Sequence, residues 1–126
     1  MRRYVLVVDD NRDWADSLAI ILRAEGYTVH AVYDGRAALE VSSTVLPDIV
    51  ILDIGLPNLS GYDVAKVFRR HPEKTRPFLV AITAWDTEQD RELGRQAGFD
   101  LYLTKPIDPR ELLRLLAEEA ERPAPD

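Results

Sequence analysis

The residues of this chain that could do chemistry stand directly after short apolar runs. They are Asp9 and Asp10 after Tyr4–Val8, Asp53 after Ile49–Leu52, Thr83 after Phe78–Ile82, and Thr104, Lys105 and Pro106 after Asp100–Leu103. Three carboxylates brought together repel one another, by about 1 kcal/mol per pair at 4 Å in water and roughly 4 kcal/mol at an effective dielectric constant near 20. A hard divalent cation such as Mg²⁺ takes oxygen ligands from one or two carboxylates, and it would offset this repulsion. Lys105 supplies one more positive charge, so the residue types predict a carboxylate, cation and lysine cluster with an open side.

Each of these residues also has an ordinary explanation when it is taken alone. Asp10 or Asn11 could cap a helix, Thr83 could be a hydroxyl at a helix start, and Lys105 could be a solvated side chain. Their joint occurrence after four apolar runs favours a functional site over four separate coincidences.

The elements that must position these residues alternate between strand and helix patterns. A further apolar run, Thr28–Tyr33, completes five strands, and apolar residues at helical spacing follow each strand. Ser60, Asp86 and Asp108 stand where helix N-caps are expected, and Gly26 and Gly98 stand where helices should end. Five such units predict a doubly wound α/β fold in which a parallel sheet carries helices on both faces. In such a sheet the carboxyl ends of the strands form the ligand-binding crevice, where the acidic residues stand.

The overall composition narrows the class of protein. The chain has 126 residues, no cysteine and a net charge of −6, which predicts one domain, no disulfide, no nucleic-acid surface and a cytoplasmic setting. No apolar run is long enough to span a bilayer, and the first residues lack the apolar core of a signal peptide, so no membrane partner is expected. We expect residues 1–121 to form the domain and 122–126 to be a Pro-rich tail or the start of a linker.

Four motifs in order resemble the response-regulator receiver domains of bacterial two-component signalling. They are VLVVDDN at 5–11, DIVILDIGLPNLSGYDV at 48–64, AITAW at 81–85 and YLTKPID at 102–108. The resemblance implies a flavodoxin-like, chemotaxis-regulator-like fold with a doubly wound parallel sheet of five strands in the order 2-1-3-4-5 and five helices. The motifs look closest to receivers of hybrid sensor histidine kinases, so the chain could be a stand-alone receiver or a module of a larger protein.

The resemblance also implies roles for individual residues. Asp53 would be the phosphoacceptor that takes a phosphoryl group from a histidine kinase or a phosphotransfer protein. Mg²⁺ (or Mn²⁺) would be held by Asp10, by Asp53, by the backbone carbonyl of Gly55 and, through water, by Asp9. Thr83 and Tyr102 would be switch residues, Lys105 would pair with a phosphoryl oxygen, and the peptide bond before Pro106 would be cis.

The implied protein is a phosphorylatable switch rather than an enzyme, limited to its own phosphotransfer and autodephosphorylation. The surface of the fourth helix, fifth strand and fifth helix would change its partner or support a homodimer. His30 and His71 are isolated in the sequence, so the donor histidine is expected on another protein. Gly55 and Trp85 depart from the commonest residues at two positions that tune the lifetime of the phosphoryl group, and the sequence leaves their net effect open.

Three other functions remain open at this point. A flavin-binding module of the same fold would need a Ser/Thr/Gly-rich phosphate loop after the first strand, where this chain has the acidic DDNRDW. A phosphohydrolase would place its nucleophile on the first strand with a second acid two residues later, whereas here the acids are adjacent. A degenerate receiver that only binds partners is disfavoured by the complete set of acids, threonine and lysine.

Overall fold

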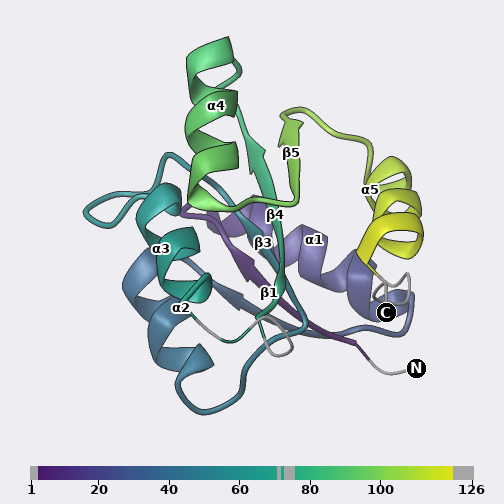
Figure 1. The fold of residues 1–126 in the computed structure, drawn as a ribbon. Helices are drawn as coiled ribbons and strands as arrows, with labels where there is room; N and C mark the ends of the chain where they lie inside the picture. Colours follow the sequence, from purple (N-terminus) through teal and green to yellow (C-terminus); the bar gives the residue numbers. More distant parts are fainter. Residues whose placement is uncertain (1–2, 71, 73–75, 121–126) are drawn as a thin grey trace.

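The computed structural model describes residues 3–70, 72 and 76–120, in which strands and helices alternate along the chain (Figure 1). The elements are β1 (Tyr4–Val8), α1 (Arg12–Ala24), β2 (Thr28–Val32), α2 (Gly35–Ser42), β3 (Ile49–Leu52), α3 (Gly61–Phe68), β4 (Phe78–Thr83), α4 (Glu88–Ala97), β5 (Leu101–Thr104), α5 (Pro109–Leu115) and the π-helix η1 (Leu116–Ala120). The five predicted strands are confirmed to within one residue at each end. The tail expected at 122–126 lies outside the described residues.

The five strands form one parallel sheet in the order β2-β1-β3-β4-β5, as expected. Val8 at the end of β1 is paired with Leu52 at the end of β3, and Leu52 is paired with Ala81 of β4. The central strands β1 and β3 are buried, because helices cover both of their faces. Their carboxyl ends are therefore held in register, and the residues that follow them meet at one edge of the sheet.

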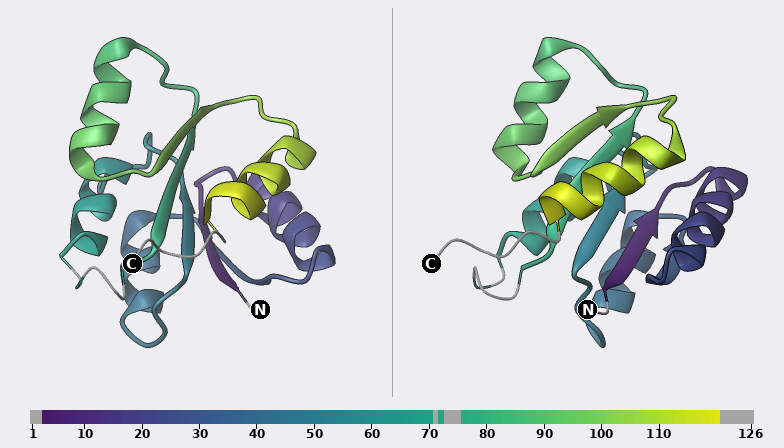
Figure 2. Two further views of the ribbon diagram at one scale, coloured as in Figure 1. Left: turned by 45° about the vertical axis from the view of Figure 1, so that its right-hand side comes forward. Right: turned by 90° about the vertical axis from the view of Figure 1, so that its right-hand side faces the viewer.

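The sheet separates two layers of helices and two apolar cores (Figures 1 and 2). On one face, α1 and α5 pack over side chains such as Val7, Ile51 and Leu112. On the other face, α2 and α3 pack over Leu6, Val50 and their neighbours, together with the C-terminal part of α4. Within the described part of the chain, no helix is long and apolar enough to cross a bilayer.

The helix boundaries follow the predicted signals, with one correction. Ser60 caps α3 in a capping box and Asp108 caps α5, as predicted. Asp86 was expected to cap α4, but the N-cap is Thr87, whose side chain accepts a hydrogen bond from the backbone N–H of Asp90. The Asp86 carboxylate instead accepts a hydrogen bond of 2.7 Å from the Arg91 guanidinium, so Asp86 binds this side chain rather than the backbone N–H groups at the start of α4.

The fifth helix α5 is followed directly by a π-helical segment. After Leu115 the chain continues as one π-helical segment, in which Leu116 is fully buried. The backbone oxygen of Ala120 accepts a hydrogen bond of 2.9 Å from the Arg3 guanidinium. This contact fastens the end of the helical region to the start of β1.

A partly buried arginine ties together the edge of the sheet opposite the acidic residues. The Arg69 guanidinium donates to the carbonyl oxygens of Gly98 and Pro77 and to the Asp100 carboxylate, the last at 2.8 Å. The same Asp100 carboxylate accepts from the backbone N–H of Leu79 at 2.8 Å. Arg69 therefore joins the end of α3 to the end of α4 and to the starts of β4 and β5.

Candidate functional site

Three carboxylates converge at the carboxyl edge of the sheet. The backbone N–H of Asp53 donates to Val8 at 3.0 Å, which fixes the end of β3 against the end of β1. Asp9, Asp10 and Asp53 each offer a carboxylate oxygen, and these three oxygens lie within 4.8 Å of one another. Asp9 is buried and Asp10 is exposed, while the side chain of Asp53 retains 14% of its accessible surface. Asp53 is thus held in the cluster and still reachable from solvent.

Lys105 is the cation that the structure places among these acids. Its Nζ atom donates to Asp9 Oδ2 at 2.7 Å and to Asp53 Oδ2 at 3.1 Å. The backbone N–H of Lys105 donates to the carbonyl oxygen of Thr83 at 2.9 Å, which holds the residue beside the end of β4. The Lys105–Pro106 peptide bond is cis, as expected.

The surroundings shift the ionisation of both partners in this pair. Burial raises the pKa of the Asp9 carboxyl above its ordinary value, and the bonds from Lys105 and from the Asn11 N–H only partly counteract that rise. Burial lowers the pKa of the Lys105 ammonium, but the hydrogen bonds and charges of Asp9 and Asp53 outweigh it, so the net pKa is raised. Asp9 and Asp53 therefore keep Lys105 protonated, while burial disfavours the ionised form of Asp9.

The loop after Asp53 is held by short backbone contacts. Asp53 Oδ1 accepts from the Gly55 N–H at 3.1 Å, and the Gly61 N–H donates to the Ile54 carbonyl oxygen at 2.9 Å. A Cβ atom at position 61 would collide with the Asp53 carbonyl oxygen and lie 2.7 Å from the Cα atom of Ile54. Gly61 is needed because the start of α3 passes directly against the backbone of Asp53 and Ile54.

The two unusual residues identified in the sequence are in contact. Three indole atoms of Trp85 lie 3.3 Å from the position that a Cβ atom would take on Gly55. Trp85 is 47% exposed, so part of this residue remains in contact with solvent. A larger residue at position 55 would bring its Cβ atom tightly against the indole, so Gly55 leaves room for Trp85 beside Asp53.

Thr83 and Tyr102 both bind the backbone of Trp85, in the loop between β4 and α4. Thr83 is fully buried at the end of β4, and its Oγ1 atom accepts from the backbone N–H of Trp85 at 3.2 Å. The Tyr102 hydroxyl donates to the backbone oxygen of Trp85 at 2.7 Å. Burial, followed by the neighbouring Tyr62, raises the pKa of the Tyr102 phenol, which therefore keeps its proton. The two expected switch residues thus hold opposite sides of one peptide segment.

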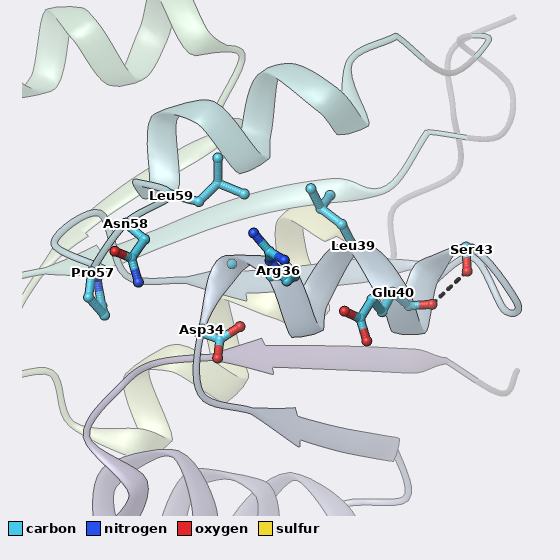
Figure 3. A pocket seen from close by; sticks show the side chains of 9 residues that line it. Asp34, Arg36, Leu39, Glu40, Ser43, Pro57, Asn58 and Leu59 are labelled. Carbon is cyan, nitrogen blue, oxygen red and sulfur yellow. Dashed lines mark hydrogen bonds between the residues drawn. The ribbon is translucent and has the colours of Figure 1, made fainter.

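A hollow of about 650 Å³ lies apart from this cluster, between α2 and the loop before α3 (Figure 3). It is lined by Asp34, Gly35, Arg36, Leu39, Glu40, Ser43, Pro57, Asn58 and Leu59. None of these residues belongs to the carboxylate cluster, so this hollow is not the crevice predicted from the strand ends.

Two residues have contacts at the site that the sequence analysis did not anticipate. The ring of Trp14, on α1, has its centroid 5.0 Å from the Nζ atom of Lys105. The guanidinium of Arg91, on α4, binds Asp86 and donates to Thr104 Oγ1 at 2.9 Å. Of the two histidines, His30 is exposed on the edge strand β2, and His71 lies outside the described residues.

The fold and the site together define a doubly wound α/β protein with an acidic, lysine-containing crevice at the carboxyl ends of its strands. The model of the response regulator receiver domain family matches residues 5–117 of this chain. The chain therefore belongs to the receiver domain family. Receiver domains are phosphorylated on an aspartate, act as signalling switches rather than classical enzymes, and interact with histidine kinases or phosphotransfer proteins.

Solved structures give the same result. A putative response regulator from Chloroflexus aurantiacus is 33% identical, with a TM-score of 0.87 over 97% of this chain and 100% of that one. The chemotaxis protein CheY4 of Vibrio cholerae is 26% identical, with a TM-score of 0.86 over 94% of this chain and 98% of that one. A CheY-like receiver domain protein from Methanospirillum hungatei is 25% identical, with a TM-score of 0.88 over 96% and 95% of the two chains.

Proposed function

We propose that Asp53 is the phosphoacceptor of a phosphorylation-dependent signalling switch. The observation that carries this proposal is the position of its carboxylate, which is accessible, 3.1 Å from the Lys105 ammonium and within 4.8 Å of two further acids. Asp9 is buried and bound at 2.7 Å by the same ammonium, while Asp10 lies at the exposed side of the cluster. Asp53 alone combines a central position with access for a donor.

In the proposed step, a carboxylate oxygen of Asp53 forms a bond to phosphorus as the bond from phosphorus to the donor's imidazole nitrogen breaks. The imidazole leaves with the electron pair of that bond, and an aspartyl phosphate remains. Such a transfer mainly requires positioning and stabilisation of the negative charge on the equatorial oxygens. Lys105 and the Thr83 hydroxyl would supply part of that stabilisation.

The acidic cluster fits a hard divalent cation, Mg²⁺ or Mn²⁺. Among the described residues, three carboxylates share the site with one lysine, so they provide oxygen donors whose negative charge this lysine alone does not balance. We assign Asp10, Asp53 and the Gly55 carbonyl as direct ligands and Asp9 as a ligand through water. When bound, the cation would neutralise phosphoryl charge and help to orient the incoming group.

The switch proposed here acts through Thr83 and Tyr102. Both residues contact the backbone of Trp85, so a shift of the Thr83 hydroxyl toward a phosphoryl group would be felt at Tyr102. The surface formed by α4, β5 and α5 would then change its partner or support a homodimer. Reversing a 1:99 population to 99:1 requires about 5.5 kcal/mol of differential stabilisation.

The proposed partner is a histidine kinase or phosphotransfer protein, and the proposed domain is 1–121, which includes the matched residues 5–117. Because phosphohistidine donors are made from ATP, we place the exchange in the cytoplasm. Slow loss of the phosphoryl group to water would reset the switch, and no multiple turnover on phosphate esters is expected.

The direct test is phosphorylation of Asp53→Asn with acetyl phosphate and Mg²⁺, followed by intact mass. Wild type should gain one phosphoryl group and the variant none. Asp48→Asn is the matched control, because Asp48 precedes the opposite end of the same strand and binds the backbone N–H of Tyr4. Normal labelling of Asp53→Asn would refute the assignment, and bound flavin in the purified protein would revive the flavin alternative.

A further inference from the structure

Trp14 lies against Lys105, although it belongs neither to the acidic cluster nor to the loop between β4 and α4 that contains Trp85. Its ring centroid is 5.0 Å from the Nζ atom of Lys105, within the range of a cation–π interaction. The residue is half-buried and packs against the core on the α1 and α5 face of the sheet. A cleft of about 80 Å³ between α1 and α5 remains beside it, so Trp14 is not enclosed by apolar packing alone.

A closed series of contacts fixes the ring relative to the acids. The backbone N–H of Asn11 donates to Asp9 Oδ1 at 2.9 Å, and the Asn11 side chain accepts from the backbone N–H of Trp14 at 3.1 Å. The ring of Trp14 faces the Lys105 ammonium, which donates to Asp9 Oδ2 at 2.7 Å. The N-cap of α1 and the lysine are thereby attached to the same carboxylate, and Trp14 joins them.

The chemical nature of this contact suits a lysine that must serve a phosphoryl group. A ring face attracts the ammonium through its quadrupole and adds no full negative charge. A fourth carboxylate in its place would hold the lysine too, but it would increase the repulsion among the acids and oppose an incoming phosphate. An aromatic ring therefore restrains Lys105 without adding an anionic competitor for it.

We propose that Trp14 is a positioning residue that orients Lys105 toward Asp53 and so accelerates phosphorylation of this carboxylate. The inference rests on the proposed function, since it assigns Trp14 a part in that same step. Loss of the ring frees the ammonium to leave the transfer geometry, while the carboxylates remain in place on β1 and β3.

The test compares phosphorylation rates at saturating acetyl phosphate and Mg²⁺ for Trp14→Leu and Trp14→Phe. The leucine variant should be about two- to fivefold slower, and the phenylalanine variant, which keeps a ring face, should stay within about twofold of wild type. Ile21→Ala is the matched control, because Ile21 lines the same cleft about two helical turns further along α1. It removes packing without removing a contact to Lys105, and its rate should equal that of wild type.

A double-mutant cycle shows whether Trp14 acts through the lysine. In a Lys105→Met background, labelled over hours, Trp14→Leu should cause no further slowing. Equal slowing in both backgrounds, a wild-type rate for Trp14→Leu, or the same slowing in Ile21→Ala would each overturn the inference and leave the proposed function intact. If wild type is not labelled on Asp53 at all, the proposed function itself fails, and the positioning role fails with it.

Discussion

Replacing Lys105 with methionine tests the electrostatics of the site most directly. Methionine keeps a long unbranched side chain but removes the ammonium that contacts Asp9 at 2.7 Å and Asp53 at 3.1 Å. Asp9 is 2% exposed, so the variant leaves a buried carboxylate without its cation. The metal-free variant should therefore be less stable than wild type at neutral pH.

The magnitude follows from the burial of the two partners. Breaking a fully buried ion pair costs about 3–5 kcal/mol, because one charge remains uncompensated. Lys105 keeps 22% of its side-chain surface, so solvent screening reduces the expected loss to about 2–3 kcal/mol. For a domain of 126 residues this corresponds to a decrease in Tm of roughly 8–11 °C.

The dependence on pH has a defined sign. Burial already raises the pKa of Asp9 in the folded protein, and loss of Lys105 removes the main interaction that lowers it. A carboxyl with a raised folded pKa costs stability when ionised, and this cost disappears as the pH falls through that pKa. The difference in free energy of unfolding between wild type and variant should therefore become smaller when the pH is lowered from 7.5 to a mildly acidic value. In wild type, Lys105 makes its full contribution to the free energy of unfolding at neutral pH. This contribution is lost only as the pH rises through the raised pKa of the lysine.

Urea denaturation at pH 7.5 and at mildly acidic pH, with and without Mg²⁺, measures these effects. Mg²⁺ at about 100 times its Kd should restore about 2.7 kcal/mol by binding the folded state. Lys66→Met on the exposed face of α3 is the matched control and should change stability by less than about 0.5 kcal/mol. A Lys105→Met variant as stable as wild type at neutral pH, or one that loses further stability relative to wild type on acidification, would show that this reasoning is wrong.

Three further predictions concern the same crevice. Asp9→Asn should raise the free energy of unfolding of the metal-free protein at neutral pH, because burial disfavours ionised Asp9. The same variant should weaken Mg²⁺ binding by more than about tenfold in a fluorescence titration. Gly61→Ala should cost about 2–3 kcal/mol in urea denaturation, because its Cβ meets the backbone of Asp53, while a loss below about 1 kcal/mol would contradict the close approach. Trp85→Ala should shorten the lifetime of the aspartyl phosphate several-fold in an intact-mass time course, because water gains access over Gly55; an unchanged lifetime would exclude the shielding role.

The fold could be predicted from the sequence because each strand is a short apolar run that ends in a turn or a charged residue. Parallel order and the crevice at the carboxyl ends then follow from general rules for alternating strands and helices. This reasoning placed Asp9, Asp10 and Asp53 together, and the structure confirms their convergence. The roles of the individual site residues remain predictions.

What the sequence did not reveal depends on side-chain direction. The spacing of residues along α1 cannot show that the ring of Trp14 faces Lys105, which is far away in the sequence. Asp86 and Thr87 are both good N-caps, and the choice between them depends on Arg91, which takes the aspartate. Competition of this kind between neighbouring partners is settled only by three-dimensional geometry.

The Arg69 contacts hold the C-terminal end of α4 in a different way from its N-terminal end. At its C-terminal end, Gly98 is fastened by the partly buried Arg69 to Pro77 and Asp100. At its N-terminal end, Arg91 binds Asp86 and Thr104 through exposed contacts, which contribute little stability in water, and the Asp90 backbone oxygen accepts from the Tyr62 hydroxyl at 3.0 Å. We therefore expect α4 to exchange its N-terminal contacts more readily than the contacts of Gly98 at its C-terminal end.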